Sequence, residues 1–145
     1  MTQAILTEKL LDYLVQNNPD ILLGLQKDLS VTKYLEDRVS LVVPLAEQLA
    51  AEGKPPYIIE EVCMNELTAD LRPSKFNYIR EVLETEFLQT CNRFQKLGVL
   101  TYEIHNLIEA CAGVFEHFGF TKENENDRSL RYVVIGTISE YLENN

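Results

Sequence analysis

One arginine lies inside an otherwise apolar helical stripe. Positions separated by 4, 3, 4, 3 and 4 residues form such a stripe, and they are occupied by Val31, Leu35, Arg38, Val42, Leu45 and Leu49. One interpretation is that the aliphatic stem of Arg38 packs while its guanidinium reaches water. The other is that Arg38 meets a buried carboxylate, because removing a guanidinium from water without a partner is strongly unfavourable.

The same periodicity suggests a partner for Arg38 in a later segment. The apolar face of residues 75–97 contains Phe76, Ile79, Leu83, Phe87 and Phe94, and Glu86 falls at its margin. We therefore predict a buried Arg38–Glu86 ion pair within hydrogen-bond distance. Such a pair more often sets helix register than performs catalysis.

A histidine with nearby carboxylates raises the question of a metal site. His105, Glu109 and Glu116 share a helical face at offsets of 4 and 7 residues, and His105 points away from Cys111, which we place in the core. A carboxylate one turn from a histidine can orient the ring or share a metal. No second ligand-bearing helix or HExxH motif accompanies the cluster. We therefore interpret it as a solvated face with His105 at the surface, and expect no metal and no cofactor.

Motifs for nucleophilic catalysis or phosphate binding are missing from the sequence. It contains no GxSxG, no Walker loop and no GxGxxG. Cys63 and Cys91 are interpreted as packing residues rather than reactive thiols. This absence favours a non-enzymatic protein, although acid–base sites built from scattered carboxylates leave no local pattern.

Apolar residues recur every three or four positions, which predicts an all-α fold. We expect a single-domain bundle of roughly six helices over residues 1–145, around one shared interior. Residues 21–24 are expected to form a loop or a short helical turn, and residues 121–128 a solvated loop. The helices are predicted over residues 4–17, 31–52, 56–71, 75–97, 101–118 and 129–143.

Helix boundaries follow from capping and breaking residues. Gly53, Gly98 and Gly119 are each placed to end a helix in the left-handed conformation, and Ser74 is placed to cap the next one. Pro44 lies inside the second predicted helix, where we expect a kink rather than a break, because the apolar stripe continues in phase on both sides.

The charge balance restricts the partners. The chain has 13 Lys and Arg against 23 Asp and Glu, a net charge of −10, so its average surface repels nucleic acids and anionic membranes. We expect no direct nucleic-acid binding. No stretch is long and apolar enough to span a bilayer, and no signal peptide precedes the first helix, so we expect a cytoplasmic protein without membrane association.

Short fragments spread along the whole chain resemble the bacterial Domain of Unknown Function 1896 family. The resemblance implies a compact helical fold and an association with mobile genetic elements, and it carries over no catalytic residue. The matching fragments are Leu11-Asp12-Tyr13-Leu14 followed by Pro19, Arg38, Ser74-Lys75-Phe76, Glu86-Phe87, Cys111 with Val114-Phe115, and Gly136-Thr137-Ile138 followed by Tyr141-Leu142-Glu143.

Three functional hypotheses follow. The first is a non-enzymatic helical module that binds another protein, or its own copy as a homodimer, through an exposed helix face. The alternative is an enzyme or small-ligand-binding protein with a pocket around Arg38 and Glu86. The third is an acidic mimic of nucleic acid, which would need its carboxylates ordered like phosphates.

Overall fold

The computed structural model describes residues 2–144, and every regular element in that range is a helix, which confirms the all-α class. The chain divides into two compact units, unit 1 (Met1–Leu71) and unit 2 (Arg72–Asn145). Each unit has its own hydrophobic core, so the expectation of one shared interior is wrong. The assignment of residues 1–145 to a single domain stays a prediction.

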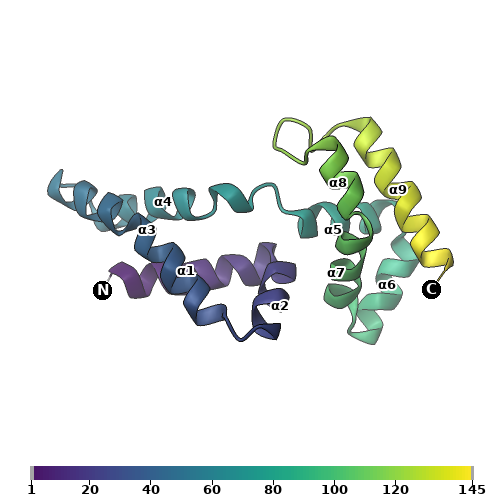
Figure 1. The fold of residues 1–145 in the computed structure, drawn as a ribbon, viewed down its shortest axis with the longest axis horizontal. Coiled ribbons are helices and arrows are strands. Elements are labelled where there is room, and N and C mark those ends of the chain that lie inside the picture. Colours follow the sequence, from purple (N-terminus) through teal and green to yellow (C-terminus); the bar gives the residue numbers. More distant parts are fainter. Residues whose placement is uncertain (1, 145) are drawn as a thin grey trace. The chain divides into compact units, whose positions relative to one another are not determined.

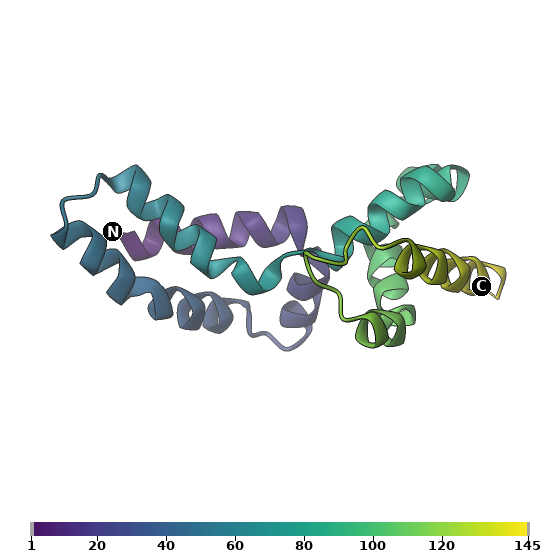
Figure 2. The same ribbon diagram turned by 90° about the horizontal axis from the view of Figure 1, so that it is seen from above.

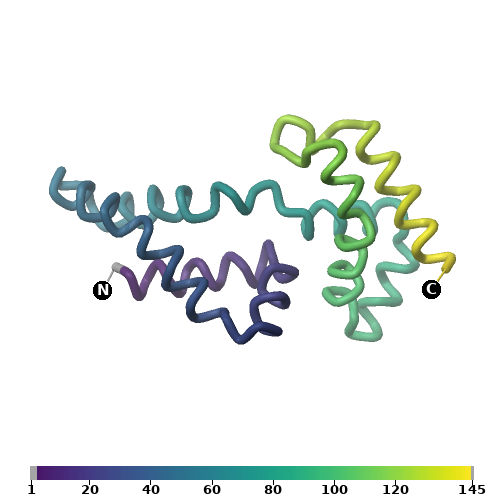
Figure 3. The backbone as a smooth tube through the Cα atoms, in the orientation of Figure 1, coloured from purple at the N-terminus to yellow at the C-terminus, as the bar shows by residue number. Residues whose placement is uncertain are grey.

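Unit 1 contains four α-helices and a short 3₁₀ helix among its described residues. They are α1 (Thr2–Asn17), α2 (Pro19–Lys27), α3 (Val31–Ala51), α4 (Pro56–Leu67) and η1 (Ala69–Leu71). The three longer helices α1, α3 and α4 pack against one another (Figures 1 and 2). The backbone turns sharply on both sides of the short α2, which contacts α1 and α3 (Figure 3).

The core of unit 1 is built from aliphatic side chains and one thiol. One stripe of α1 contributes three leucines that are completely buried, as expected when apolar residues repeat every four positions on a helix. Across α1 and α4, Lys9 Nζ lies 3.2 Å from Glu60 Oε2 at the edge of this core. The buried hydrophobic residues of this core are Leu6, Leu10, Leu14, Leu35, Val39, Val42, Ala46, Ile59, Cys63, Leu67 and Leu71.

Unit 2 contains five α-helices among its described residues. They are α5 (Lys75–Glu86), α6 (Leu88–Leu97), α7 (Leu100–Ala110), α8 (Ala112–Phe118) and α9 (Arg128–Glu143). Helix α7 contacts α5, α6 and α9, and α8 lies beside α9 (Figure 1). The expected solvated loop before α9 is present over residues 119–127.

Aromatic rings form part of the unit 2 interior. Phe115 is 2% exposed, and its ring centroid lies 4.8 Å from that of Phe120 and 5.8 Å from that of Tyr78. Phe120 thus folds back onto Phe115 across the end of α8. The buried residues of this core are Phe76, Ile79, Val82, Leu83, Cys91, Ile104, Leu107, Cys111, Phe115, Leu130, Val134 and Ile138.

The expected number of roughly six helices is wrong, because residues 2–144 contain nine α-helices. The predicted helix over 75–97 is broken at Phe87, whose φ and ψ are −138° and 47°. Val82 and Cys91 are both buried, yet nine positions apart they would face opposite sides of one continuous helix. The break between α5 and α6 lets both side chains reach the core.

Two other boundaries account for the rest of the difference between the expected and the observed number of helices. The predicted helix over 101–118 is interrupted at Cys111, but the bonds from Cys111 N to Leu107 O (2.9 Å) and from Phe115 N to Cys111 O (3.0 Å) keep its buried face in phase. The first helix ends at Asn17 as predicted, and Pro19 then starts α2, because proline is well tolerated at the first helical position. The segment expected as a loop or short turn is thus a nine-residue helix.

Several sequence-based boundaries are confirmed. Gly53, Gly98 and Gly119 adopt φ values of 80°, 72° and 68° after their helices. The hydroxyl of Ser74 accepts a 3.0 Å hydrogen bond from the amide of Asn77. Helix α3 runs from Val31 to Ala51 with Pro44 inside it. Within residues 2–144, no helix has the length and apolar character needed to cross a membrane.

Candidate interaction surface and the predicted site residues

Arg38 is paired with a carboxylate, but the partner is Asp70 of η1. Its Nη1 donates to Asp70 Oδ2 at 2.7 Å, and its Nη2 donates both to Asp70 Oδ1 and to the backbone carbonyl of Leu67 at 2.7 Å. The guanidinium also lies over the ring of Tyr34, 5.5 Å from its centroid. This bidentate arrangement fastens α3 to the end of α4, where a carbonyl would otherwise lack a donor.

Arg38 and Asp70 stabilise each other's charged forms. The hydrogen bond from Arg38 holds the pKa of the Asp70 carboxyl below its usual value, and the same bond raises the pKa of Arg38. The side chain of Asp70 is 60% exposed, so water screens much of the attraction. The pair therefore acts chiefly as a geometric clamp within unit 1.

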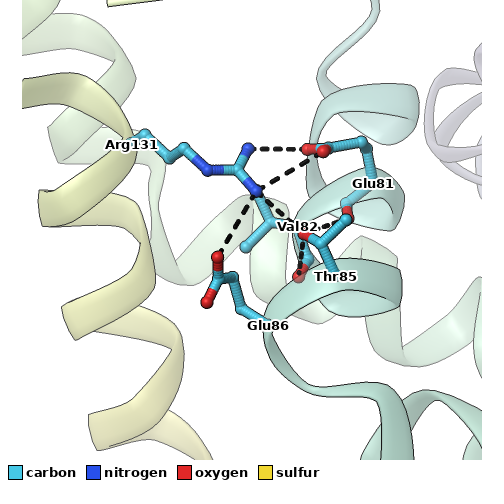
Figure 4. Close-up of polar contacts among 5 residues, drawn as sticks. All are labelled: Glu81, Val82, Thr85, Glu86 and Arg131. Atoms are coloured by element: carbon cyan, nitrogen blue, oxygen red, sulfur yellow. Dashed lines mark hydrogen bonds and ion pairs between the residues drawn. The ribbon is translucent and has the colours of Figure 1, made fainter. Parts of the chain in front are cut away.

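Glu86 belongs to a second arginine cluster, in unit 2 (Figure 4). Arg131 of α9 reaches toward α5, where Nη1 donates to Glu81 Oε2 at 2.7 Å and Nη2 donates to Thr85 Oγ1 at 2.8 Å. Glu86 Oε1 lies farther away, 3.8 Å from Arg131 Nη2, and the residue is exposed. Glu86 is thus a peripheral member of a cluster that joins α9 to α5.

The predicted buried Arg38–Glu86 pair is therefore corrected. The two residues belong to different units, each has a partner within its own unit, and Glu86 is exposed rather than buried. Of the two interpretations of Arg38, pairing with a carboxylate is confirmed, but the carboxylate of Asp70 is exposed rather than buried. Helical periodicity could not identify Asp70, because that residue follows the end of α4 and its direction depends on the 3₁₀ turn.

The histidine cluster is only partly assembled. His105 Nε2 lies 3.3 Å from Glu109 Oε1 on α7, whereas Glu116 is exposed on α8. Contrary to the prediction of a surface imidazole, the His105 side chain is only 15% exposed and its Nδ1 is buried without a hydrogen-bond partner. Because α7 contacts α5, α6, α8 and α9, more of its circumference is covered than a helical wheel with one buried face predicts.

In the described part of the chain, neither the potential metal ligands nor the three thiols are arranged for chemistry. In residues 2–144, no three His, Cys, Asp or Glu side chains are close enough to hold a metal ion together. Cys63, Cys91 and Cys111 are all buried, as predicted. Burial raises the pKa of each thiol, and that of Cys111 reaches about 11, so the nucleophilic thiolate is disfavoured.

The turn between α2 and α3 carries a surface that the sequence did not reveal. A shallow depression of about 380 Å³ is lined by Gln26, Leu29, Val31 and Thr32. The Leu29 side chain is 93% exposed at this turn, more than any other exposed large hydrophobic residue among those described. We call this depression, with Leu29, the α2–α3 surface.

Leu29 also has an unfavourable backbone conformation. Its φ is +55°, in the left-handed region that costs a residue with a Cβ about 1–2 kcal/mol. The conformation closes α2, since Ser30 N donates to Leu25 O at 2.9 Å and Leu29 N donates to Gln26 O at 3.2 Å. Glycine or asparagine is usual at such a position. The left-handed backbone of Leu29 is visible only in the structure, so helical periodicity did not single this residue out.

Helix α2 extends the apolar character of this surface. Its middle contains four large aliphatic residues, yet no residue of α2 is fully buried. A surface helix normally buries one apolar stripe and exposes a polar face. Helix α2 instead leaves all of its aliphatic residues partly accessible, namely Ile21, Leu22, Leu23 and Leu25.

Comparison with protein-family models, with curated proteins and with solved structures found no match to the chain.

Proposed function

We propose that this protein is a non-enzymatic helical interaction module, and that its α2–α3 surface binds an apolar side chain presented by a basic segment of another protein. The observation that carries the proposal is Leu29, which combines a left-handed backbone with an almost completely exposed side chain. Both features are unfavourable in the free protein, and a bound partner would remove the exposure.

The charge distribution supports a basic partner. Unit 1 has 12 acidic and 5 basic residues, a net charge of −7. Next to Leu29, Lys27 and Asp28 are both exposed, and Lys33 on the first turns of α3 is paired with Asp37 at 2.9 Å, so the excess negative charge belongs to the unit as a whole. A positively charged segment would therefore be attracted to this unit, and its apolar residue would supply the short-range contact.

The arginine clusters and the thiols support a non-enzymatic role. Arg38 and Arg131 each bind a carboxylate and hold two helices of one unit together. The three cysteines are buried with raised pKa values. The family resemblance adds the further proposal that the partner comes from a mobile genetic element.

Replacement of Leu29 tests this function. Leu29→Gly removes the apolar anchor and suits the backbone conformation, so we expect partner binding to be lost while the free energy of unfolding stays unchanged or rises by up to ~1 kcal/mol. The matched control is Leu41→Ala on α3, which removes another exposed leucine and should retain binding.

The measurement is tagged capture from the native cell at low and moderate salt, with the recovered proteins identified by mass spectrometry and their binding repeated with purified components. A basic protein that is retained by wild type and Leu41→Ala, lost with Leu29→Gly and weakened by salt supports the proposal. Equal retention of the same partner by Leu29→Gly would rule out the α2–α3 surface.

A further inference from the structure

Helix α9 has a continuous exposed stripe on the side opposite its buried residues. The stripe is basic at its beginning, apolar and small in the middle, and acidic at its end. At about 100° per residue, all its members lie within roughly 80° of the direction of Gly136. They are Arg128, Ser129, Tyr132, Val133, Gly136, Glu140 and Glu143.

The order of charges on this stripe opposes the dipole of α9. A helix favours acidic residues in its first turn and basic residues in its last, and α9 has neither. Asp127 caps the N-terminus by accepting a 3.2 Å bond from Leu130 N, but within the helix Arg128 comes first and Glu143 last. The arrangement is thus unfavourable for an isolated helix.

No packing contact among residues 2–144 requires a glycine at position 136, in the middle of the stripe. A Cβ added there would meet no atom within 4 Å, and the residue is exposed in the interior of a helix. Glycine at such a position destabilises a helix by about 0.5–1 kcal/mol relative to alanine. The benefit it offers is close approach by another backbone or a flat side chain.

We propose that α9 forms an antiparallel, two-fold symmetric homodimer with α9 of a second copy of this chain, with the two helices crossing at Gly136. Because the dipoles then oppose, the basic start of each stripe faces the acidic end of the other. With a rise of ~1.5 Å per residue, Arg128 lies about 12 Å before Gly136 and Glu143 about 10.5 Å after it. Arg128 of one copy therefore comes level with Glu143 of the other.

The apolar centre fits the same arrangement. Tyr132, 67% exposed, and Val133, 44% exposed, flank Gly136 and would cover the glycine of the opposite copy. Arg131 is not needed, because it is engaged with Glu81 inside unit 2. A self-complementary patch is what a two-fold interface requires. The dimer uses unit 2, and so it does not depend on the function proposed for the α2–α3 surface.

Substitution of the central glycine provides the first test. Gly136→Arg places two bulky cations at the crossing point, so we expect the dimer dissociation constant of the full-length chain to rise about 100-fold. Its folding should not suffer, because arginine has a better helix propensity than glycine. The matched control is Gly113→Arg on α8, another exposed helical glycine with open space around it, which should remain dimeric.

Charge reversal provides the second test. Arg128→Glu and Glu143→Arg should each weaken the dimer about tenfold, and the double variant should restore it, since the reversed charges again face each other. A purely intramolecular dipole effect predicts instead that each single change stabilises the fold and leaves association unchanged. Sedimentation velocity over the micromolar range measures the dissociation constants.

Three results would overturn the proposal. They are a wild-type chain that stays monomeric throughout the micromolar range, a dimer that tolerates Gly136→Arg, and single charge reversals that the double variant does not rescue. Loss of partner capture by Leu29→Gly would leave the dimer intact, so the two proposals can fail separately.

Discussion

Unit 1 and unit 2 are both small helical assemblies, but their interiors are filled differently. The buried hydrophobic residues of unit 1 are aliphatic apart from Cys63, whereas unit 2 buries Phe76 and Phe115 and packs further aromatic rings against Phe115. Each unit also has one arginine clamp, Arg38 with Asp70 or Arg131 with Glu81. A helical unit can therefore have either an aliphatic or a partly aromatic interior, and in each unit an arginine ion pair joins two of the surrounding elements.

The two units also differ in charge. Unit 1 has a net charge of −7, and unit 2, with 11 acidic and 8 basic residues, has −3. Unit 1 is therefore suited to attracting a basic partner, while the more balanced unit 2 can place opposite charges at the two ends of α9. This difference is why we assign partner binding to one unit and self-association to the other.

The largest expected effect comes from the aromatic core. Phe115→Ala removes a buried ring with two ring neighbours, so we expect the free energy of unfolding of unit 2 to fall by ~3–5 kcal/mol. Amide hydrogen exchange should accelerate in α5, α7 and α9 and change much less in α1 and α3. Leu10→Ala is the control, and it should accelerate exchange mainly in α1 and α3 and much less in α5, α7 and α9. Equal acceleration in both units would contradict the separation of the cores.

The next effect is a loss of stability in alkaline solution. The Cys111 thiol is neutral below its pKa, which burial raises from the ordinary 9.0 to about 11. The folded state therefore holds this proton more tightly, and its contribution, fully present below pH 9, is lost as the pH rises toward 11. We expect a loss of ~2 kcal/mol from unit 2 over that window.

Denaturant unfolding at a series of pH values measures this loss. Cys111→Ala is the control. It removes the titrating thiol, so its free energy of unfolding should differ less between neutral and alkaline solution. Cys63→Ala tests the same point in unit 1, where the thiol pKa is also raised by burial, and we expect it to change the pH dependence less. A wild-type profile identical to that of Cys111→Ala would contradict the prediction.

The smallest effect distinguishes the two arginine clamps. Arg38→Met should lower the free energy of unfolding by ~1–2 kcal/mol, because it leaves the Leu67 carbonyl without its donor as well as breaking the pair with Asp70. Arg131→Met should lower it by less than ~1 kcal/mol, since its partners Glu81 and Thr85 are exposed and can turn to water. A double-mutant cycle with Asp70→Asn isolates the Arg38–Asp70 coupling. A larger loss for Arg131→Met would reverse the ranking.

Local sequence signals determined much of the secondary structure. The apolar stripe of α3, the left-handed glycines after three helices, the Ser74 cap and the burial of Cys111 were all predictable, because each depends on residues within a few turns. The same periodicity placed Arg38 on a packed face and offered a carboxylate partner as one of two interpretations.

Tertiary packing decided what local periodicity could not. The break at Phe87 arises because Val82 and Cys91 must both reach one core, although a straight helix would separate them. The choice of Asp70 over Glu86 depends on how the 3₁₀ turn follows α4. The spacing of apolar residues along the chain determines which face of each helix is apolar. The partner of that face, and the presence of two cores rather than one, depend on contacts between residues far apart in the chain.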